Sequence, residues 1–303
     1  MVLLQQMIVL FIMMLFGWFG GRKGVFDDEF IGKLTWLVVN IANPALALSA
    51  SVCADGAIRG ESLVVSCVVA VLMYIIMIPL GILVSNIIRA KEEDKGTYQL
   101  MTVFANIGFM GYPLIKVMFG SEALLYGTPF LLLYNIFIYT WGISVMQKGK
   151  EKTEGFSLRK VMNPGVVAGI VSIIIYLVGV DMPVFIEDSV EMLSNIAAPL
   201  SMMVIGHSFC KMKLRELFTD VRLLIFSAIK LLVIPIAGMM ILKLFIDNEL
   251  LLAVCTVVLA TPSGSMTAML AREYGGNYET ASKGVALTTL LSVVTMPLVF
   301  AIV

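Results

Sequence analysis

One stretch, Phe104–Pro113, most restricts how this chain can fold. It lies inside an apolar run long enough to cross a bilayer, yet it contains residues that a spanning helix avoids. Asn106, Gly108 and Gly111 lower helix propensity, and Pro113 lacks the amide that would bond back along the helix. Broken backbone at membrane depth is tolerated only where it is buried in protein or lines a cavity. The stretch therefore predicts an interrupted transmembrane helix beside a cavity.

The remaining apolar runs read as further membrane spans. Of the 303 residues, 59% are hydrophobic and only 14% are charged, and the mean hydropathy is +0.97. A soluble domain of this length carries nearly twice that charged fraction, so the composition predicts an integral membrane protein. A span needs about 20 apolar residues. On that basis we expect an all-α membrane protein with ten transmembrane helices, at 2–20, 30–52, 62–88, 96–119, 122–146, 163–180, 183–209, 221–243, 248–271 and 280–303.

Basic residues are distributed unevenly among the loops between these spans. The loops after spans 1, 3, 5, 7 and 9 hold most of the lysines and arginines, whereas the even-numbered loops hold only Arg59, Lys116 and Lys243. Because positively charged loops stay in the cytoplasm, the odd-numbered loops are predicted to be cytoplasmic. We therefore expect a multi-pass protein of the inner (plasma) membrane with both termini outside.

The two halves of the chain are similar in sequence. A shift of 155 residues aligns Asn40–Pro44 with Asn195–Pro199 and Ala105-Asn106 with Ala260-Thr261. The broken span 4 then corresponds to span 9, where Thr261–Gly264 interrupts the helix. Several matches at a constant offset indicate an internal repeat rather than chance similarity.

The repeat defines the expected organisation of the chain. The hydrophilic stretch 147–162 separates the halves, so we expect a first five-helix repeat at 1–146, a cytoplasmic linker at 147–162 and a second five-helix repeat at 163–303. Since five is an odd number, the two repeats must have opposite orientations in the membrane. Inverted repeats with paired discontinuous helices, here helices 4 and 9, are typical of alternating-access transporters.

Three motifs resemble the auxin efflux carrier family, in its bacterial membrane transport protein branch within the bile acid/sodium symporter-like superfamily. They are Asn43–Leu46 in span 2, Asn106–Leu114 in span 4, and Thr261-Pro262 followed by Ala271–Gly275 in span 9. The resemblance covers essentially the whole chain. It implies a scaffold domain, a mobile domain in which helices 4 and 9 cross, transport of an organic anion, and a homodimer. Plant members carry auxins, and bacterial relatives are associated with dicarboxylates such as malate or malonate.

The breaks in spans 4 and 9 are the candidate substrate site. Each second half-helix begins inside the membrane, where its amides and positive dipole end favour an anion. Thr261 and Pro262 fit an N-cap and first-turn pair. Asn106, Thr261, Ser263 and Ser265 offer hydrogen bonds to a carboxylate, and Gly108 and Gly264 allow close approach of the backbone. The alternative is that these small polar residues only hold helices together.

Two further residues complete the candidate set. Asn43 precedes Pro44 in span 2, and the repeat places an alanine at the equivalent position, an asymmetry that an asymmetric ligand requires. The alternative is a packing kink at Pro44 and Pro199. Lys230 falls near the centre of span 8, where it would give an anion its counter-charge or stabilise one conformation. The alternative is a register that places Lys230 near the cytoplasmic edge.

These features favour a secondary carrier of a small organic anion, with a ligand-binding membrane sensor on a transporter fold as the alternative. An enzyme is disfavoured, because the chain has one histidine and no acid deep within a span. No nucleotide-binding, metal-binding or nucleophile motif is present, and the four cysteines lack metal-site spacing. We therefore expect no cofactor, no metal and no nucleic-acid partner; the expected partners are the substrate and the bilayer.

Overall fold

The computed structural model describes residues 2–52, 60–147, 161–180, 182–210 and 217–302. All regular secondary structure among these residues is helical, and seven helices are long and apolar enough to cross a bilayer. Three shorter apolar helices lie at Ile107–Phe119, Pro164–Val178 and Glu249–Ala260. An all-helical membrane protein is thus confirmed, whereas ten spans in two inverted repeats stay a prediction. The predicted linker at 147–162 lies largely outside the described residues.

The helices of the first half run from the N-terminus to residue 146. They are α1 (Val2–Arg22), α2 (Asp28–Leu37), α3 (Asn43–Val52), α4 (Gly60–Ile87), α5 (Glu92–Val103), α6 (Tyr112–Phe119), α7 (Ala123–Phe137) and α8 (Ile143–Met146). Those of the second half are α10 (Pro164–Val178), α11 (Val184–Asn195), α12 (Ala197–Ser208), α14 (Val221–Ala228), α15 (Ile234–Leu242), α16 (Glu249–Ala260), α17 (Met266–Tyr274) and α18 (Tyr278–Ile302).

Four wider, π-helical turns connect some of these helices, and three of the four end two residues before a proline. A proline lacks the N–H for the usual helical bond, and its ring clashes with the carbonyl four residues earlier. A π-helical turn changes the hydrogen-bonding pattern at that carbonyl and so accommodates the ring. The three turns are η1 (Val38–Ala42) before Pro44, η2 (Ile107–Gly111) before Pro113 and η4 (Ile229–Val233) before Pro235; η3 (Ile138–Gly142) has no proline after it.

Span 7 is interrupted at Ile196, between α11 and α12. Pro199 lies in the first turn of α12, and the carbonyl that its ring would meet belongs to Asn195, the last residue of α11. The helix is therefore interrupted three residues before Pro199, the proline for which a packing kink was the alternative. At Pro44 the chain stays helical through η1 instead of breaking.

The breaks at 104–106 and 261–265 lie against each other. An isolated antiparallel bridge pairs Ala105 with Ser263, although the two residues are far apart in sequence. Two backbone hydrogen bonds close this crossing, from the Asn106 N–H to the Pro262 carbonyl (2.7 Å) and from the Gly264 N–H to the Phe104 carbonyl (2.8 Å). The polar backbone groups of each break are thus satisfied by the other break, as apolar surroundings require.

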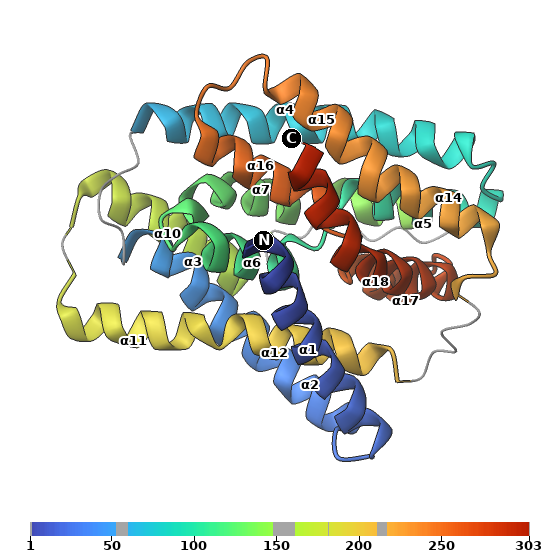
Figure 1. Ribbon diagram of the computed structural model, residues 1–303, viewed down its shortest axis with the longest axis horizontal. Coiled ribbons are helices and arrows are strands. Elements are labelled where there is room, and N and C mark those ends of the chain that lie inside the picture. The colour runs from blue at the N-terminus through green and yellow to red at the C-terminus, as the bar shows by residue number, and fades with distance from the viewer. Residues whose placement is uncertain (1, 53–59, 148–160, 181, 211–216, 303) are drawn as a thin grey trace.

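Two groups of helices surround the crossing (Figure 1). In one group α1 packs along α12, and α3 packs against α10 and α11. In the other, α4 packs against α5 and α7, and α18 packs against α14, η4 and α17. Figure 1 shows α11 and α12 along one long edge of the molecule and α4 along the opposite edge. The crossing belongs to the second group and faces the first.

Candidate functional site

A cavity of about 130 Å³ lies beside the crossing. Asn43 at the start of α3, Asn106 and Gly108 in the first break, and Ser265 in the second break all line it. Aromatic side chains, among them Tyr134, form a large part of the remaining wall. None of the described residues that line the cavity carries a charge, so a ligand there is recognised by hydrogen bonds, helix dipoles and apolar contact.

Three helices begin at this cavity. Gly108 and Phe109 belong to the first turn of η2, Met266 begins α17, and Gly165 lies in the first turn of α10. Amide N–H groups in a first turn have no acceptor within their own helix, and together they place partial positive charge at the helix start. Anions bind at such positions without a charged side chain. The cavity is therefore electrostatically suited to a negatively charged group.

The residues predicted at the span 9 break divide into two sets. Ser265 lines the cavity, whereas Thr261, Pro262, Ser263 and Gly264 build the crossing. The Ser263 hydroxyl donates to the Met101 carbonyl at 2.9 Å, and the Ser263 N–H donates to the Thr288 hydroxyl at 3.2 Å. These hydrogen bonds hold the break in place and leave the Ser263 hydroxyl proton committed to the protein.

The expected capping role of Thr261 is wrong. Thr261 is the C-cap of α16, and its hydroxyl donates to the Val258 carbonyl at 2.9 Å instead of accepting an amide of the next helix. The second half-helix starts four residues later, with Ser265 as N-cap and Met266 as its first residue. Pairing with the span 4 break keeps 261–264 out of the helix and so moves the helix start to Ser265.

Lys230 lies away from the cavity, in the π-helical turn η4 between α14 and α15. Its side chain is 1% exposed and forms no hydrogen bond or ion pair with any residue that the structure describes. Lys230 does not line the cavity beside the crossing and does not lie at an exposed edge. It is a buried cation without a described counter-charge. A role of Lys230 in stabilising one conformation stays a prediction.

A second, larger cavity of about 910 Å³ opens next to the first, and Ser265 lines both. Ser265, Ala268 and Arg272 form one face of α17 along its wall, at the i, i+3 and i+7 spacing of a helix face. His207 of α12 lines the same cavity from the other group of helices. We call this cavity the vestibule. Its wall includes Arg272 and Lys283, which the sequence assigns to the basic loop after span 9, and it shares Ser265 of the second break with the first cavity.

Residues 2–300 match the membrane transport protein family, the family of the auxin efflux carriers. The chain belongs to the membrane transport protein family. An uncharacterized transporter from Methanocaldococcus jannaschii is 27% identical over 311 residues, which cover 98% of both chains. Another, from Methanothermobacter thermautotrophicus, is 27% identical over 306 residues, which cover 97% of this chain and 96% of the relative.

Membership of this family makes the protein a membrane transporter, and it confirms the resemblance seen in the sequence motifs. Both relatives are described as transporters, without a stated substrate. The substrate class and the mechanism of this family member therefore rest on the cavity itself.

Five lining residues of the transporter's cavity that have polar side chains were missed from the sequence: Tyr112, Tyr134, Asn135, Tyr139 and Asn163. Asn163 is the N-cap of α10 and directly precedes Pro164, a helix-start signal that could have placed a polar residue at a helix end. Asn135 lies within α7, where a single amide in an apolar helix gives no indication of which neighbour it faces.

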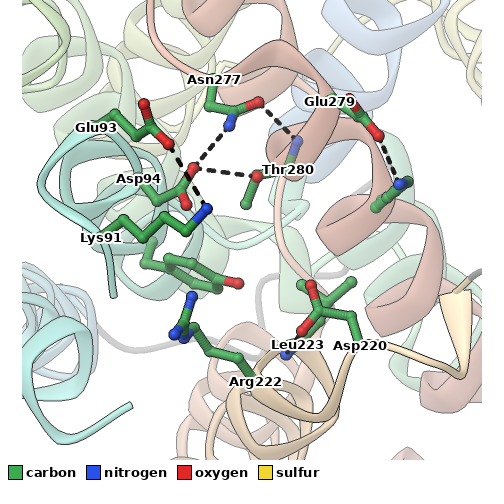
Figure 2. A pocket seen from close by; sticks show the side chains of 11 residues that line it. Lys91, Glu93, Asp94, Asp220, Arg222, Leu223, Asn277, Glu279 and Thr280 are labelled. Carbon is green, nitrogen blue, oxygen red and sulfur yellow. Dashed lines mark hydrogen bonds and ion pairs between the residues drawn. The ribbon is translucent and has the colours of Figure 1, made fainter. Parts of the chain in front are cut away.

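A polar pocket of about 220 Å³ lies where α5, α14 and α18 begin (Figure 2). Asp94 is 7% exposed, and its Oδ1 accepts hydrogen bonds from the Asn277 side chain (2.7 Å) and the Thr280 hydroxyl (3.1 Å). Figure 2 shows Lys91 and Arg222 on the α5 and α14 walls of the same pocket. These contacts tie α5, which leads into the first break, to the start of α18.

Proposed function

We propose that this membrane transporter is a secondary carrier that moves a small organic anion, a carboxylate, by alternating access. The observation that carries the proposal is the meeting of two broken helices beside an uncharged cavity at which three helices begin. Helix starts favour a carboxylate without burying a full counter-charge. Paired discontinuous helices at membrane depth are the usual substrate site of such carriers.

The proposal includes the architecture and the orientation. Ten helices span the inner membrane as two inverted repeats, at 1–146 and 163–303, with both termini outside. The vestibule then faces the cytoplasm, and the conformation is inward-facing. The group of helices that holds the crossing moves against the group around α1 and α12, which carries the cavity to the other side.

Asn106 supplies the sharpest test, because it is 3% exposed, lies in the break and lines the cavity. We would measure thermal stabilisation of the purified protein by propionate and succinate, with neutral and cationic solutes as controls, with and without sodium. A ligand that binds only the folded state raises the unfolding midpoint by mass action. A carboxylate should stabilise the wild type, and Asn106→Ala should bind it about tenfold more weakly, the effect of one lost hydrogen bond to a charged group.

Asn40→Ala is a matched control, because Asn40 lies in η1 and donates to the Trp36 carbonyl without lining the cavity. Uptake of the same carboxylate into proteoliposomes then separates a carrier from a sensor, since a sensor binds without flux. Stabilisation by cations alone, or wild-type affinity and flux in Asn106→Ala, would refute the proposed site.

A further inference from the structure

Lys116 forms hydrogen bonds with a helix of the other group. It lies in the last turn of α6, and its ammonium group donates to the Ser194 hydroxyl and, at 2.8 Å, to Asn195 Oδ1. Ser194 and Asn195 are the last two residues of α11. Because α6 directly follows the first break and η2, it belongs to the group that holds the crossing, whereas α11 belongs to the group around α1 and α12. The contact therefore joins the two groups that the proposed mechanism moves against each other.

Two helix ends favour the ammonium group at this position. The last carbonyls of a helix have no acceptor role within it and carry partial negative charge, so a cation is stabilised there. Lys116 extends from the end of α6 to the end of α11. Ser194 is 2% exposed and donates its own proton to the Glu191 carbonyl, which leaves its hydroxyl oxygen to accept from Lys116. Charge-assisted hydrogen bonds are stronger than neutral ones, so the contact stabilises the conformation in which it forms.

The contact and the vestibule lie at opposite ends of α12. This helix begins at Ala197, two residues after Asn195, and ends at Ser208, which lines the vestibule together with His207. Its 12 residues extend over about 18 Å. The vestibule, about 910 Å³ in volume, lies between the end of α12 and the helices α17 and α18. The two groups are thus joined through Lys116 near the start of α12 and separated at its end.

One continuous helical stretch connects the contact to the ligand cavity. Residues Ile107–Phe119 form this stretch through η2 and α6. Gly108 lines the ligand cavity at its beginning, and Lys116 follows eight residues later, on the order of 10 Å along the axis. Movement of the stretch with the crossing, which the proposed mechanism requires, therefore displaces Lys116 relative to α11.

Building on the proposed alternating access, we propose that Lys116, Ser194 and Asn195 form a latch that holds the carrier in its inward-facing conformation. The sequence assigns Lys116 to an even-numbered loop, on the side opposite the vestibule. The latch releases when the two groups separate on that side and the vestibule closes. Loss of the latch shifts the population toward the conformation with a closed vestibule.

The distance across the vestibule tests the proposal. Ser208 and Ser282 line the vestibule from α12 and α18, so spin labels on Ser208→Cys and Ser282→Cys approach each other when it closes. The labels would be introduced into the full-length protein with its native cysteines replaced, in lipid nanodiscs without ligand, and the distances measured by double electron–electron resonance. Lys116→Met should raise the ratio of short to long distances about tenfold, the effect of losing a hydrogen bond to a charged group.

Lys33→Met is the matched control, because the Lys33 ammonium group binds Glu29 within its own helix and should leave the distances unchanged. Ser194→Ala and Asn195→Ala should shift the distances in the same direction as Lys116→Met. Combined with Lys116→Met, they should add nothing, since their partner is already absent. These two variants also test the latch if Lys116→Met does not insert.

Unchanged distances in all three latch variants, or shifts that add fully in the combined variants, would overturn the latch. Uptake of propionate and succinate into proteoliposomes separates this failure from that of the proposed function. Flux through the wild type with unchanged distances in the variants refutes the latch and leaves the carrier proposal intact. Absence of carboxylate flux through the wild type refutes the carrier proposal, whatever the distances are.

Discussion

Replacing Lys230 with methionine should make the protein more resistant to heat. Lys230 is 1% exposed within a predicted span and lacks a hydrogen-bonding or ionic partner in the part of the chain that the structure describes. A charged lysine at the centre of a membrane helix costs about 2.5–3.5 kcal/mol. Methionine fills a similar volume with an unbranched, apolar chain. Lys230→Met should therefore stabilise the fold by about 2–3 kcal/mol, which raises the unfolding midpoint by roughly 5 °C for a chain of this size.

The assay is thermal unfolding of the detergent-solubilised protein followed by tryptophan fluorescence. Lys243→Met is the matched control, because Lys243 is exposed at the end of α15 and its replacement should move the midpoint little. A lower midpoint for Lys230→Met would refute the reasoning, since it would mean that the ammonium group has a favourable partner. Flux should be measured alongside. A variant that is more stable but inactive would show that transport uses the Lys230 charge. Functional sites often lower stability in this way.

The crossing and the polar pocket yield two further predictions. Gly264→Ala should lower the unfolding midpoint by several degrees, because its Cβ would lie 3.1 Å from the Phe104 carbonyl oxygen, whereas Gly108→Ala should fold normally and narrow the cavity, which a binding titration detects. Asp94→Ala should destabilise the fold by about 2 kcal/mol, because it leaves Asn277 and a threonine hydroxyl of α18 without their acceptor; a chemical-denaturation midpoint equal to the wild type would contradict this.

The sequence predicted where the helices break but not how the breaks are stabilised. Asn, Gly and Pro within ten residues are local signals, so the interruption of span 4 follows from them directly. The stretch Thr261–Ser265 contains several residues able to cap a helix, and local preference alone favoured Thr261. The choice of Ser265 comes from the bridge between Ala105 and Ser263, which joins residues from opposite halves of the chain. Such a contact has no local signature.

The candidate site shows the same limit. Asn106, Gly108 and Ser265 could be predicted because each lies at a helix break, and Asn43 because it precedes a proline. The amide of Asn135 lies in the uninterrupted helix α7, so only the packing of α7 against α3 and α10 brings it to the cavity. The burial of Lys230 and its lack of a counter-charge among the described residues could not be predicted locally, because both depend on every helix packed around η4.

The crossing also explains how polar protein groups at the cavity can remain unpaired although the backbone of the two breaks is hydrogen-bonded. Backbone interrupted within a membrane needs partners, and the two breaks supply them to each other through Asn106, Pro262 and Gly264. Those bonds use the backbone on the side where the breaks meet. The side chain of Asn106 and the first turn of η2 lie on the other side, toward the cavity, and Asn106 Nδ2 has no hydrogen-bond partner among the described residues. The same break can therefore be rigid on one side and open to a ligand on the other, which lets a carrier move the site as a unit without reorganising the groups that bind.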